Sequence, residues 1–337
     1  MRIVVTGGAG FIGSNFVRWM LDADPAVSIV TLDALTYAGN AENLDGLSPV
    51  RHQLVVGDVT RMRDVAGVLD RRVDAVVHFA AESHVDRSIS SAQAFAATNV
   101  VGTQVVLDAV RQAGVPRLVH VSTDEVYGSL APGEPPFTEA HPLTPTSPYA
   151  ASKAGADLLV LAAAATHGLD AVITRCGNNY GPYQFPEKLI PLFITNALAG
   201  QPLPLYGDGR QVRDWIHVED HCRAIAAVLQ RGRPGRVYNI GAHGEQDNLS
   251  VAHQILSLLH LDPGQIRHVA DRPAHDRRYA LDTERIEREL DWRPTIEFGD
   301  GLAAAVSWYQ EHRDWWERVK SGAYRTYYES QYGSRLP

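Results

Sequence analysis

Residues 2–13 read Arg2-Ile3-Val4-Val5-Thr6-Gly7-Gly8-Ala9-Gly10-Phe11-Ile12-Gly13. The β-branched run at the start predicts a strand and the apolar spacing after it predicts a helix, so the glycines lie in the turn between them. Gly7 and Gly10 would let the backbone turn tightly and approach a pyrophosphate, while Gly13 would let the helix close on the sheet. A glycine-rich turn also occurs in ordinary strand–helix loops, so a dinucleotide site needs support from the residues that follow.

The second predicted strand supplies such support. Val27 to Leu32 is an apolar run that ends in Asp33, twenty positions after Gly13. A carboxylate at this place can accept hydrogen bonds from both ribose hydroxyls of the adenosine half and repels a 2′-phosphate. We therefore expect dinucleotide binding, with NAD favoured over NADP. The alternative is a fold that retains only the scaffold.

Two further strands end in candidate cofactor contacts. Leu54 to Val59 contains Asp58, which could accept a hydrogen bond from the adenine amino group while Val59 packs beside the ring. The alternative role for Asp58 is a helix N-cap for the segment from Arg61. Ala75 to Ala81 is a fourth strand, and the backbone near its end could run alongside the bound cofactor.

The central strand ends in polar residues. Arg117 to Ser122 is followed directly by Thr123, Asp124 and Glu125. Open α/β sheets bind their ligands at the carboxyl ends of the strands, so we expect this hydroxyl and these two acids to face the site.

A helix after this strand adds two more titratable groups. Tyr149 and Lys153 have the i, i+4 spacing that sets both on one helical face, with Ser147 as a candidate N-cap and Pro148 at the first helical position. We expect tyrosine, lysine and both acids to converge on one cleft.

The helix predicted from Asn99 to Ala113, with Gly114 as its C-cap, resembles the Tyr149 helix in being rich in alanine, valine and leucine. The surfaces of these two helices could pair with a second subunit. The alternative is that they pack only on their own sheet.

The alternation of strand and helix ends after Ala171 to Arg175. We therefore predict an α/β fold in which a Rossmann-type doubly wound parallel sheet, residues 1–177, binds NAD and a smaller lobe, residues 178–337, mainly binds substrate. Residues 236–241 read as a strand that returns to the first sheet.

The second lobe contains a basic cluster in an acidic protein, from Asp271 to Tyr279. Arg272 together with Arg213 could fork onto the oxygens of a diphosphate. The alternative is a solvated loop.

Composition excludes several classes of protein. The chain has 337 residues, 45% of them apolar, and a net charge of −8, which argues against a nucleic-acid surface. The chain has two cysteines, so a disulfide framework is not expected. No sequence pattern predicts a metal site. No apolar run approaches the roughly 20 residues that cross a bilayer, and no signal peptide precedes the first strand. We expect a cytoplasmic protein without membrane or nucleic-acid partners.

Taken together, these motifs resemble the extended short-chain dehydrogenase/reductase superfamily and, within it, the dTDP-glucose 4,6-dehydratases. The glycine turn and the Tyr149–Lys153 pair carry the likeness to the superfamily. The likeness to the dehydratases, from Met1 to about Trp316, is carried by the stretches Ala81-Glu82-Ser83-His84-Val85-Asp86, Thr123-Asp124-Glu125, Asn178-Asn179-Tyr180-Gly181-Pro182, Glu187-Lys188-Leu189-Ile190-Pro191 and Arg272 to Tyr279. Related sugar-nucleotide epimerases typically carry small hydroxyl residues where the two acids stand.

The resemblance implies two sets of contacts. NAD contacts are implied at Phe11, Ile12, Asp33, Ala34, Leu35, Thr36, Asp58, Val59, Phe79, Ala80, Ala81, Thr98, Tyr149, Lys153 and Asn179. Contacts with the substrate, dTDP-glucose, are implied at Ser83, Thr123, Asn178, Lys188, Leu189, Pro204, Leu205, Tyr206, Arg213, Asn248, Arg272 and His275. No residue by itself indicates thymine. The resemblance also implies a homodimer joined by a four-helix bundle.

The implied chemistry fits the side chains. Tyr149 would take the proton of the 4-hydroxyl, with Lys153 lowering the tyrosine pKa and bonding the nicotinamide ribose. Once C4 is a ketone, Glu125 would remove the C5 proton while Asp124 protonates the departing C6 hydroxyl, and Thr123 would hydrogen-bond the C4 oxygen. Two alternatives remain: another NAD-dependent sugar-nucleotide epimerase or dehydratase, and a non-catalytic dinucleotide-binding protein.

Overall fold

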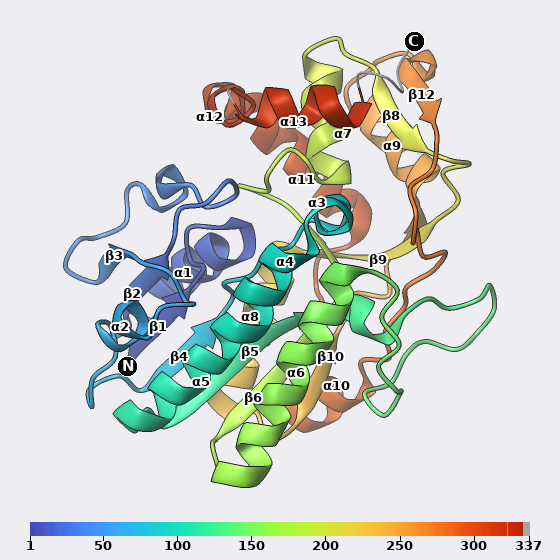
Figure 1. The fold of residues 1–337 in the computed structure, drawn as a ribbon. Helices are drawn as coiled ribbons and strands as arrows, with labels where there is room; N and C mark the ends of the chain where they lie inside the picture. Colours follow the sequence, from blue (N-terminus) through green and yellow to red (C-terminus); the bar gives the residue numbers. More distant parts are fainter. Residues whose placement is uncertain (322, 333–337) are drawn as a thin grey trace.

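The central sheet holds seven parallel strands in the order β10-β6-β5-β4-β1-β2-β3 (Figure 1). The computed structural model describes residues 1–321 and 323–332. The strands of this sheet are β1 (Arg2–Thr6), β2 (Ser28–Asp33), β3 (His52–Val56), β4 (Ala75–His78), β5 (Arg117–Thr123), β6 (Ala171–Cys176) and β10 (Val237–Ile240). The strand order reverses between β1 and β4, which is where sheets of this kind bind ligands. The predicted fold class is confirmed.

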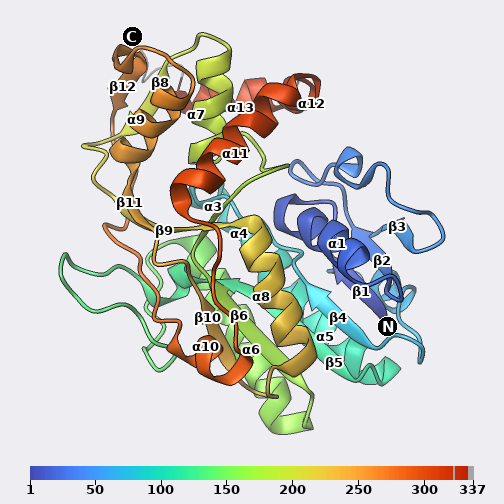
Figure 2. The same cartoon turned by 180° about the vertical axis from the view of Figure 1, so that it is seen from behind.

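Helices cover both faces of the sheet. One face carries α2 (Met62–Ala66), α5 (Gly102–Ala113) and α6 (Pro148–His167), and the opposite face carries α1 (Phe11–Ala23) and α8 (Val218–Arg231) (Figures 1 and 2). Along β1, Ile3 and Val5 pack into the core beneath α1 and α8, whereas Val4 packs into the core beneath α5 and α6. Burial on both faces explains why the strands read as unbroken apolar runs.

The helix predicted from Asn99 begins earlier and is not uniform. A helical run starts at α4 (Ala92–Phe95), passes through a π-helical segment (Ala96–Val101) and continues as α5, which ends at Gly114 in the left-handed conformation as predicted. Apolar spacing cannot reveal the wider π turn. Such turns often occur at functional sites.

The second lobe has its own core and two small sheets. Its elements are β7 (Asn178–Tyr180), α7 (Leu189–Leu198), β8 (Leu203–Tyr206), β9 (Val212–His217), β11 (Glu245–Asp247), α9 (Asn248–Leu258), β12 (Ile266–Val269), α11 (Phe298–Glu311), α12 (Arg313–Val319) and α13 (Ala323–Tyr332). One sheet has the order β11-β9-β7, and β8 pairs with β12. Between these elements the chain returns to the first sheet, where β10 pairs with β6, as expected for residues 236–241.

The residues from Ile286 to Trp316 do not form one continuous helix. Helix α10 (Glu284–Leu290) ends at Asp291, whose backbone is left-handed (φ 48°), and the next helix, α11, begins only at Phe298. Pro294 lies between them and cannot continue a helix.

The described residues were expected to hold neither a membrane-spanning helix nor a metal site. Within residues 1–321 and 323–332, no helix combines the length and apolarity that a bilayer span requires. The same part of the chain holds no group of three or more histidine, cysteine or acidic side chains arranged for a metal ion.

Candidate active site

The carboxyl end of β5 positions a hydroxyl and two carboxyl groups. Residues Asp124 to Tyr127 form a 3₁₀ turn directly after the strand. The Thr123 hydroxyl caps this turn by accepting a hydrogen bond from the Glu125 amide (3.2 Å), and it donates to Asp124 Oδ1 (3.2 Å). Thr123 therefore fixes the places of both acids.

The two carboxyl groups differ in their surroundings. Asp124 is 2% exposed, and burial followed by the adjacent Glu125 charge raises its pKa well above the usual range. Burial also raises the pKa of Glu125, but the cationic side chains of Lys188 and Arg272 oppose that shift. Asp124 is thus suited to hold a proton, and Glu125 is better suited to be ionised.

Helix α6 brings Tyr149 beside these acids. The Ser147 hydroxyl accepts a hydrogen bond from the Ala150 amide (3.1 Å), and Pro148 is the first helical residue, as predicted. Tyr149 is buried and hydrogen-bonds the Thr123 side chain. Burial, followed by the Glu125 charge, raises the pKa of Tyr149, and its hydrogen bond to Thr123 acts in the opposite direction.

Lys153 lies one helical turn after Tyr149 and points toward β5. Its ammonium donates to the Val121 carbonyl oxygen (2.8 Å), and burial lowers its pKa to about 8, while the Asp157 charge acts in the opposite direction. Asp157 is fully buried, accepts a hydrogen bond from Arg175 (2.8 Å) and lies 3.5 Å from the His120 ring. Sequence reasoning missed Asp157, although the four-residue spacing from Tyr149 through Lys153 continues to it.

Asn99 has a positioning role that sequence reasoning did not assign to it. In the π-helical segment its side chain accepts a hydrogen bond from the Glu82 amide (2.8 Å) and donates to the Glu82 carbonyl (3.0 Å) and the Ser152 hydroxyl (2.8 Å). It therefore ties the loop after β4 to helix α6. Thr98, an expected NAD contact, lies in the same segment.

The glycine turn has the geometry of a dinucleotide cradle. Gly7 has a φ of 72°, and a Cβ there would stand 2.5 Å from the Ala80 amide nitrogen, so only glycine fits between the turn and the end of β4. Helix α1 begins at Phe11 with no side-chain cap and no acid in its first turn. Its N-terminal amides and dipole are therefore available for a phosphate group.

Asp33 has a structural task in addition to the predicted one. At the end of β2 its carboxylate accepts hydrogen bonds from the Ala9 amide (2.9 Å) and the Leu35 amide (2.8 Å). Burial raises its pKa, and these two bonds lower it. A carboxylate has about four acceptor positions, so two remain for ribose hydroxyls. Ala34, Leu35 and Thr36 follow directly in the loop.

Two other expected cofactor residues are held by polar contacts. Asp58 accepts hydrogen bonds from the amide and hydroxyl of Thr60 (both 2.8 Å), and α2 has Arg61 as its N-cap residue, so Asp58 is not the N-cap of α2. Asn179 on β7 lies 2.9 Å from the His221 ring. Phe79, Ala80 and Ala81 follow β4 at the same sheet edge.

A pocket between the sheet edge and the second lobe gathers most predicted substrate contacts. Its predicted lining residues are Glu125, Asn178, Lys188, Leu189, Pro204, Leu205, Tyr206, Arg213, Asn248, Arg272 and His275. Ser83 is joined to this pocket because its carbonyl accepts a hydrogen bond from Lys188 (2.8 Å). Lining residues that sequence reasoning did not assign are His84, Val85, Asp86, Glu187, Leu192, Phe193, Trp215, Tyr279 and Tyr332.

Several polar side-chain atoms in or beside this pocket have no hydrogen-bond partner among the described residues. Asn178 Oδ1, Asn248 Oδ1 and Trp215 Nε1 are buried and have no hydrogen-bond partner among the described residues. Asp124 Oδ2, next to the lining residue Glu125, also has no partner among the described residues. Unpaired buried polar groups are unfavourable, so the three that belong to pocket-lining residues are candidates to bond a polar ligand.

The arginine pair lies inside the protein rather than in a solvated loop. The Arg272 side chain is 14% exposed and forms an ion pair with Asp86 (3.2 Å). Arg213 is buried, donates to the Asp276 carbonyl (2.9 Å) and stacks on the Tyr279 ring at 4.3 Å. Both guanidinium groups belong to the lining of the pocket.

Comparison with known proteins agrees with this geometry. A family model described as GDP-mannose 4,6 dehydratase matches residues 4–305. A dTDP-glucose 4,6-dehydratase of Streptomyces niveus is 52% identical over 326 residues, which cover 95% of this chain and 96% of the relative. The protein of the same name from Salmonella typhimurium is 46% identical, with 99% of this chain and 100% of the relative covered.

The chain belongs to the dTDP-glucose 4,6-dehydratase family. Among solved structures, the family member DesIV of Streptomyces venezuelae, crystallised with NAD, matches with a TM-score of 0.92 and 56% identity over 95% of this chain and 100% of that one. The UDP-glucose 4-epimerase of Thermus thermophilus, also in complex with NAD, matches with a TM-score of 0.86 but only 31% identity over 93% of this chain and 100% of that one. The family thus shares its fold with epimerases and is separated from them by sequence.

Proposed function

We propose that this protein converts dTDP-glucose to dTDP-4-keto-6-deoxyglucose and water, with NAD as its cofactor. The observation that carries the proposal is the pair of unlike carboxyl groups, Asp124 and Glu125, held beside Tyr149 at the end of β5. An epimerase needs no acid to expel water, whereas a dehydratase needs both a proton donor and a base. The identities near 50% to proteins of that name support the same nucleotide.

The chain's residues would act in three steps. Tyr149 takes the proton of the 4-hydroxyl, while Thr123 hydrogen-bonds the C4 oxygen. The chemistry that NAD would supply, when held by the glycine turn, Asp33 and Lys153, is acceptance of the C4 hydrogen as hydride and its return to C6. With C4 a ketone, Glu125 removes the acidified C5 proton and Asp124 protonates the C6 hydroxyl, which leaves as water. Glu125 then returns its proton to C5. Because the hydride taken from C4 ends on C6, there is no net oxidation, and release of the proton held by Tyr149 to solvent together with uptake of one by Asp124 restores both groups.

NAD would bind along the sheet edge. The α1 N-terminus and the turn at Gly7 and Gly10 would hold the pyrophosphate, and Asp33 the adenosine ribose. Lys153 would bond the nicotinamide ribose. We propose that residues 1–177 mainly bind NAD and residues 178–337 mainly bind the sugar nucleotide, with the strand near 236–241 belonging to the first part.

The substrate diphosphate would lie between Arg213 and Arg272, which both line the pocket. Guanidinium groups favour bidentate bonds to phosphate oxygens. Binding there would require Arg272 to exchange its ion pair with Asp86 for the diphosphate.

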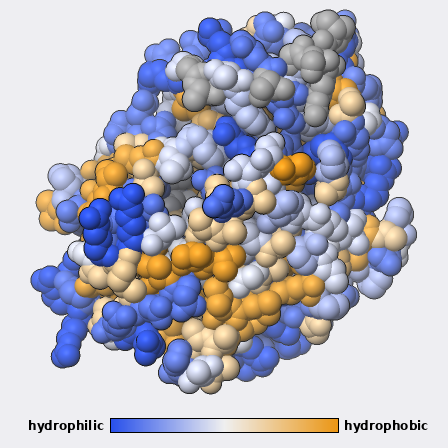
Figure 3. Space-filling view, viewed as in Figure 1, coloured by the Kyte–Doolittle hydropathy of each residue, from blue (hydrophilic) through white to orange (hydrophobic). Residues whose placement is uncertain are grey.

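We also propose a cytoplasmic homodimer joined through α5 and α6. Val101, the last residue of the π-helical segment before α5, and Leu158 on α6 are 54% and 58% exposed. Apolar side chains gather over these helices in Figure 3. A continuous apolar face of this kind is typical of an interface. Two copies would then contribute two helices each to a four-helix bundle. Both cysteines are free and buried, which suits a reducing compartment.

The deciding experiment is incubation of the purified protein with dTDP-glucose, UDP-glucose and GDP-mannose. Formation of a 4-keto-6-deoxy sugar from dTDP-glucose, faster than from the other two, is the expected result. Conversion to a C4 epimer without loss of water would show an epimerase. Absence of any conversion, with NAD retained, would show a binding protein.

A further inference from the structure

Lysine is rare in this chain. Of 31 lysine and arginine residues only three are lysines, at positions 153, 188 and 320. Lys153 and Lys188 lie in the candidate active site, where a compact amine on a flexible stem differs from a guanidinium in its chemistry. The third, Lys320, follows helix α12 and lines a different pocket.

Lys320 is held without a counter-ion. Its ammonium donates to Thr195 Oγ1 (3.1 Å) and Asn196 Oδ1 (2.9 Å) on α7, and it lies 5.7 Å from the ring centres of both Trp316 and Tyr324. No carboxylate forms an ion pair with it among residues 1–321 and 323–332. Burial lowers its pKa to about 8.

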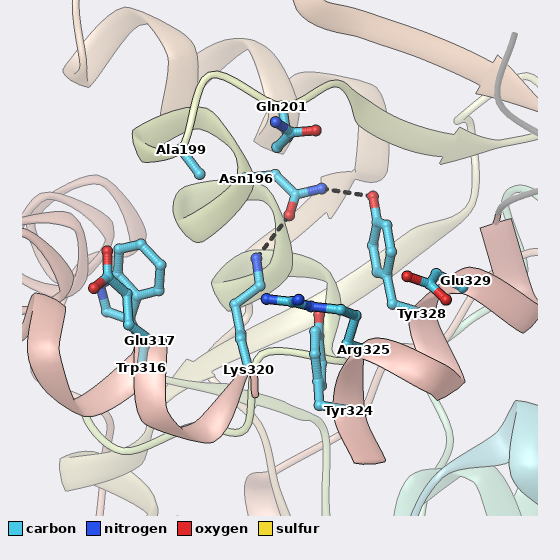
Figure 4. Close-up of a pocket in the computed structure, with 10 residues that line it drawn as sticks. All are labelled: Asn196, Ala199, Gln201, Trp316, Glu317, Lys320, Tyr324, Arg325, Tyr328 and Glu329. Carbon is cyan, nitrogen blue, oxygen red and sulfur yellow. Dashed lines mark hydrogen bonds between the residues drawn. The ribbon is translucent and has the colours of Figure 1, made fainter. Parts of the chain in front are cut away.

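The pocket around Lys320 has the size of a small-molecule site. It encloses about 650 Å³ between α7, α12 and α13 (Figure 4). This lies within the roughly 300–1,000 Å³ of typical ligand pockets. Trp316, Tyr324 and Tyr328 form aromatic walls, and the Asn196 amide donates to the Tyr328 hydroxyl (3.0 Å). None of its ten lining residues lines the substrate pocket.

A second cation points into the same space. Arg325 is exposed and also lines the pocket (Figure 4), and it forms no hydrogen bond or ion pair with any other described residue. The two acids of the lining do not neutralise this pair. Glu317 is bonded to Arg313 (2.7 Å), and Glu329 lies beyond Tyr328. The anion-binding groups that the pocket offers are therefore the Lys320 ammonium and the Arg325 guanidinium.

We propose that this pocket is a second ligand site, which takes a small organic anion with a flat apolar body. The anionic group would lie between Lys320 and Arg325, and the flat body would pack against the aromatic walls. The competing explanation is that Lys320 only links α12 to α7. That explanation accounts for its bonds to Thr195 and Asn196, but it leaves Arg325 and the open aromatic walls without a role.

The test uses phenyl phosphate as the probe, with the native dimer or monomer saturated with NAD and dTDP so that the active site is filled. Lys320 is acetylated with an N-hydroxysulfosuccinimide ester, and the three lysines are followed separately by peptide mass spectrometry. Bound phenyl phosphate should slow acetylation of Lys320 by about fivefold or more, because a charge-assisted bond withdraws the amine from reaction. Inorganic phosphate and phenol, which each supply half of the ligand, should protect less.

Two variants separate ligand binding from a structural role. Arg325→Gln changes an exposed side chain and should weaken phenyl phosphate binding in calorimetry by about tenfold, the usual worth of one charge-assisted contact. Its matched control is Arg318→Gln, which removes a nearby cation that pairs with Glu42 outside the pocket and should leave the affinity unchanged. Lys320→Met should abolish the binding.

The proposal is overturned if phenyl phosphate does not protect Lys320, or if Arg325→Gln and Arg318→Gln bind the probe equally well. Lys320→Met could instead fail to fold. In that case the protection experiment on the native protein and the Arg325→Gln affinity still decide the question.

Discussion

Replacing each acid of the Asp124–Glu125 pair by its amide separates the two halves of the proposed reaction. The Asp124→Asn and Glu125→Gln proteins should fold, because an amide has nearly the shape of the acid and keeps the oxygen that Asp124 presents to Thr123. The other Asp124 oxygen has no partner among the described residues, so the new NH₂ group breaks no bond. The effect should therefore fall on catalysis.

The magnitude follows from the role of each group. Proton transfer by a positioned side chain contributes about 10²–10⁴ in rate, or roughly 3–5 kcal/mol of barrier. We expect both variants to oxidise C4 normally, so that enzyme-bound reduced nicotinamide accumulates and persists on mixing with dTDP-glucose. Tyr149→Phe, in contrast, should form none, because the 4-hydroxyl proton has no acceptor.

The assay is a stopped-flow record of nicotinamide absorbance together with exchange of the C5 proton in deuterated water. Glu125→Gln should lose this exchange more severely than Asp124→Asn. The roles would have to be interchanged if Asp124→Asn lost the exchange and Glu125→Gln kept it. Full turnover in both variants would refute the dehydratase mechanism.

The pH profile gives an independent check of the same pair. Because burial raises the pKa of Glu125, its ionised form is lost as pH falls through a value above the usual carboxyl range near 4.3. The acid limb of kcat should accordingly lie above that range. A limb at or below it would contradict Glu125 as the base.

Further predictions concern the cofactor, the substrate, the buried network and the dimer. Asp33→Ala should weaken NAD retention and Asp33→Arg should shift preference toward NADP in equilibrium binding; unchanged preference in both removes Asp33 from the site. Arg272→Gln should raise KM for dTDP-glucose with little change in kcat, and an unchanged KM would exclude its diphosphate contact. Asp157→Asn should move the alkaline limb of the pH–activity profile to lower pH, since the Asp157 charge raises the Lys153 pKa. A melting curve measures any loss of stability caused by leaving Arg175 unpaired. An alkaline limb that does not move would show that the Asp157 charge does not affect activity. The Leu158→Glu protein should sediment as a 36.9 kDa monomer, because a charge is placed on the proposed interface. If the native protein also sediments as a monomer, the proposed dimer is wrong.

The predictions from sequence were most accurate for features that residues close together in the chain determine. The glycine turn, Asp33 at the end of β2, and Tyr149 with Lys153 on one helical face all depend on residues close together in the chain. The Ser147 cap and the left-handed Gly114 are similarly local. These features need no knowledge of the tertiary structure, and the structure places them as expected.

What sequence reasoning missed depends on distant residues or on burial. Asp86 pairs with Arg272 across 186 positions, so no spacing rule connects them. Tyr332 reaches the substrate pocket from the last described helix. The raised pKa of Tyr149 follows from burial and neighbouring carboxylates, which only a three-dimensional arrangement supplies. The π turn at Asn99 has the same apolar pattern as an α-helix.

The late return of β10 to the first sheet has a consequence for biosynthesis. During translation β6 is made first, and the 60 residues from 177 to 236 must follow before its edge partner exists. At about 5–20 residues per second, the ribosome leaves that edge unpaired for roughly 3–12 seconds. An exposed parallel strand invites pairing with other nascent chains. A fragment that stops at residue 177 should therefore aggregate, and this enzyme should depend on chaperones that hold the half-made sheet apart from its neighbours until the missing strand arrives.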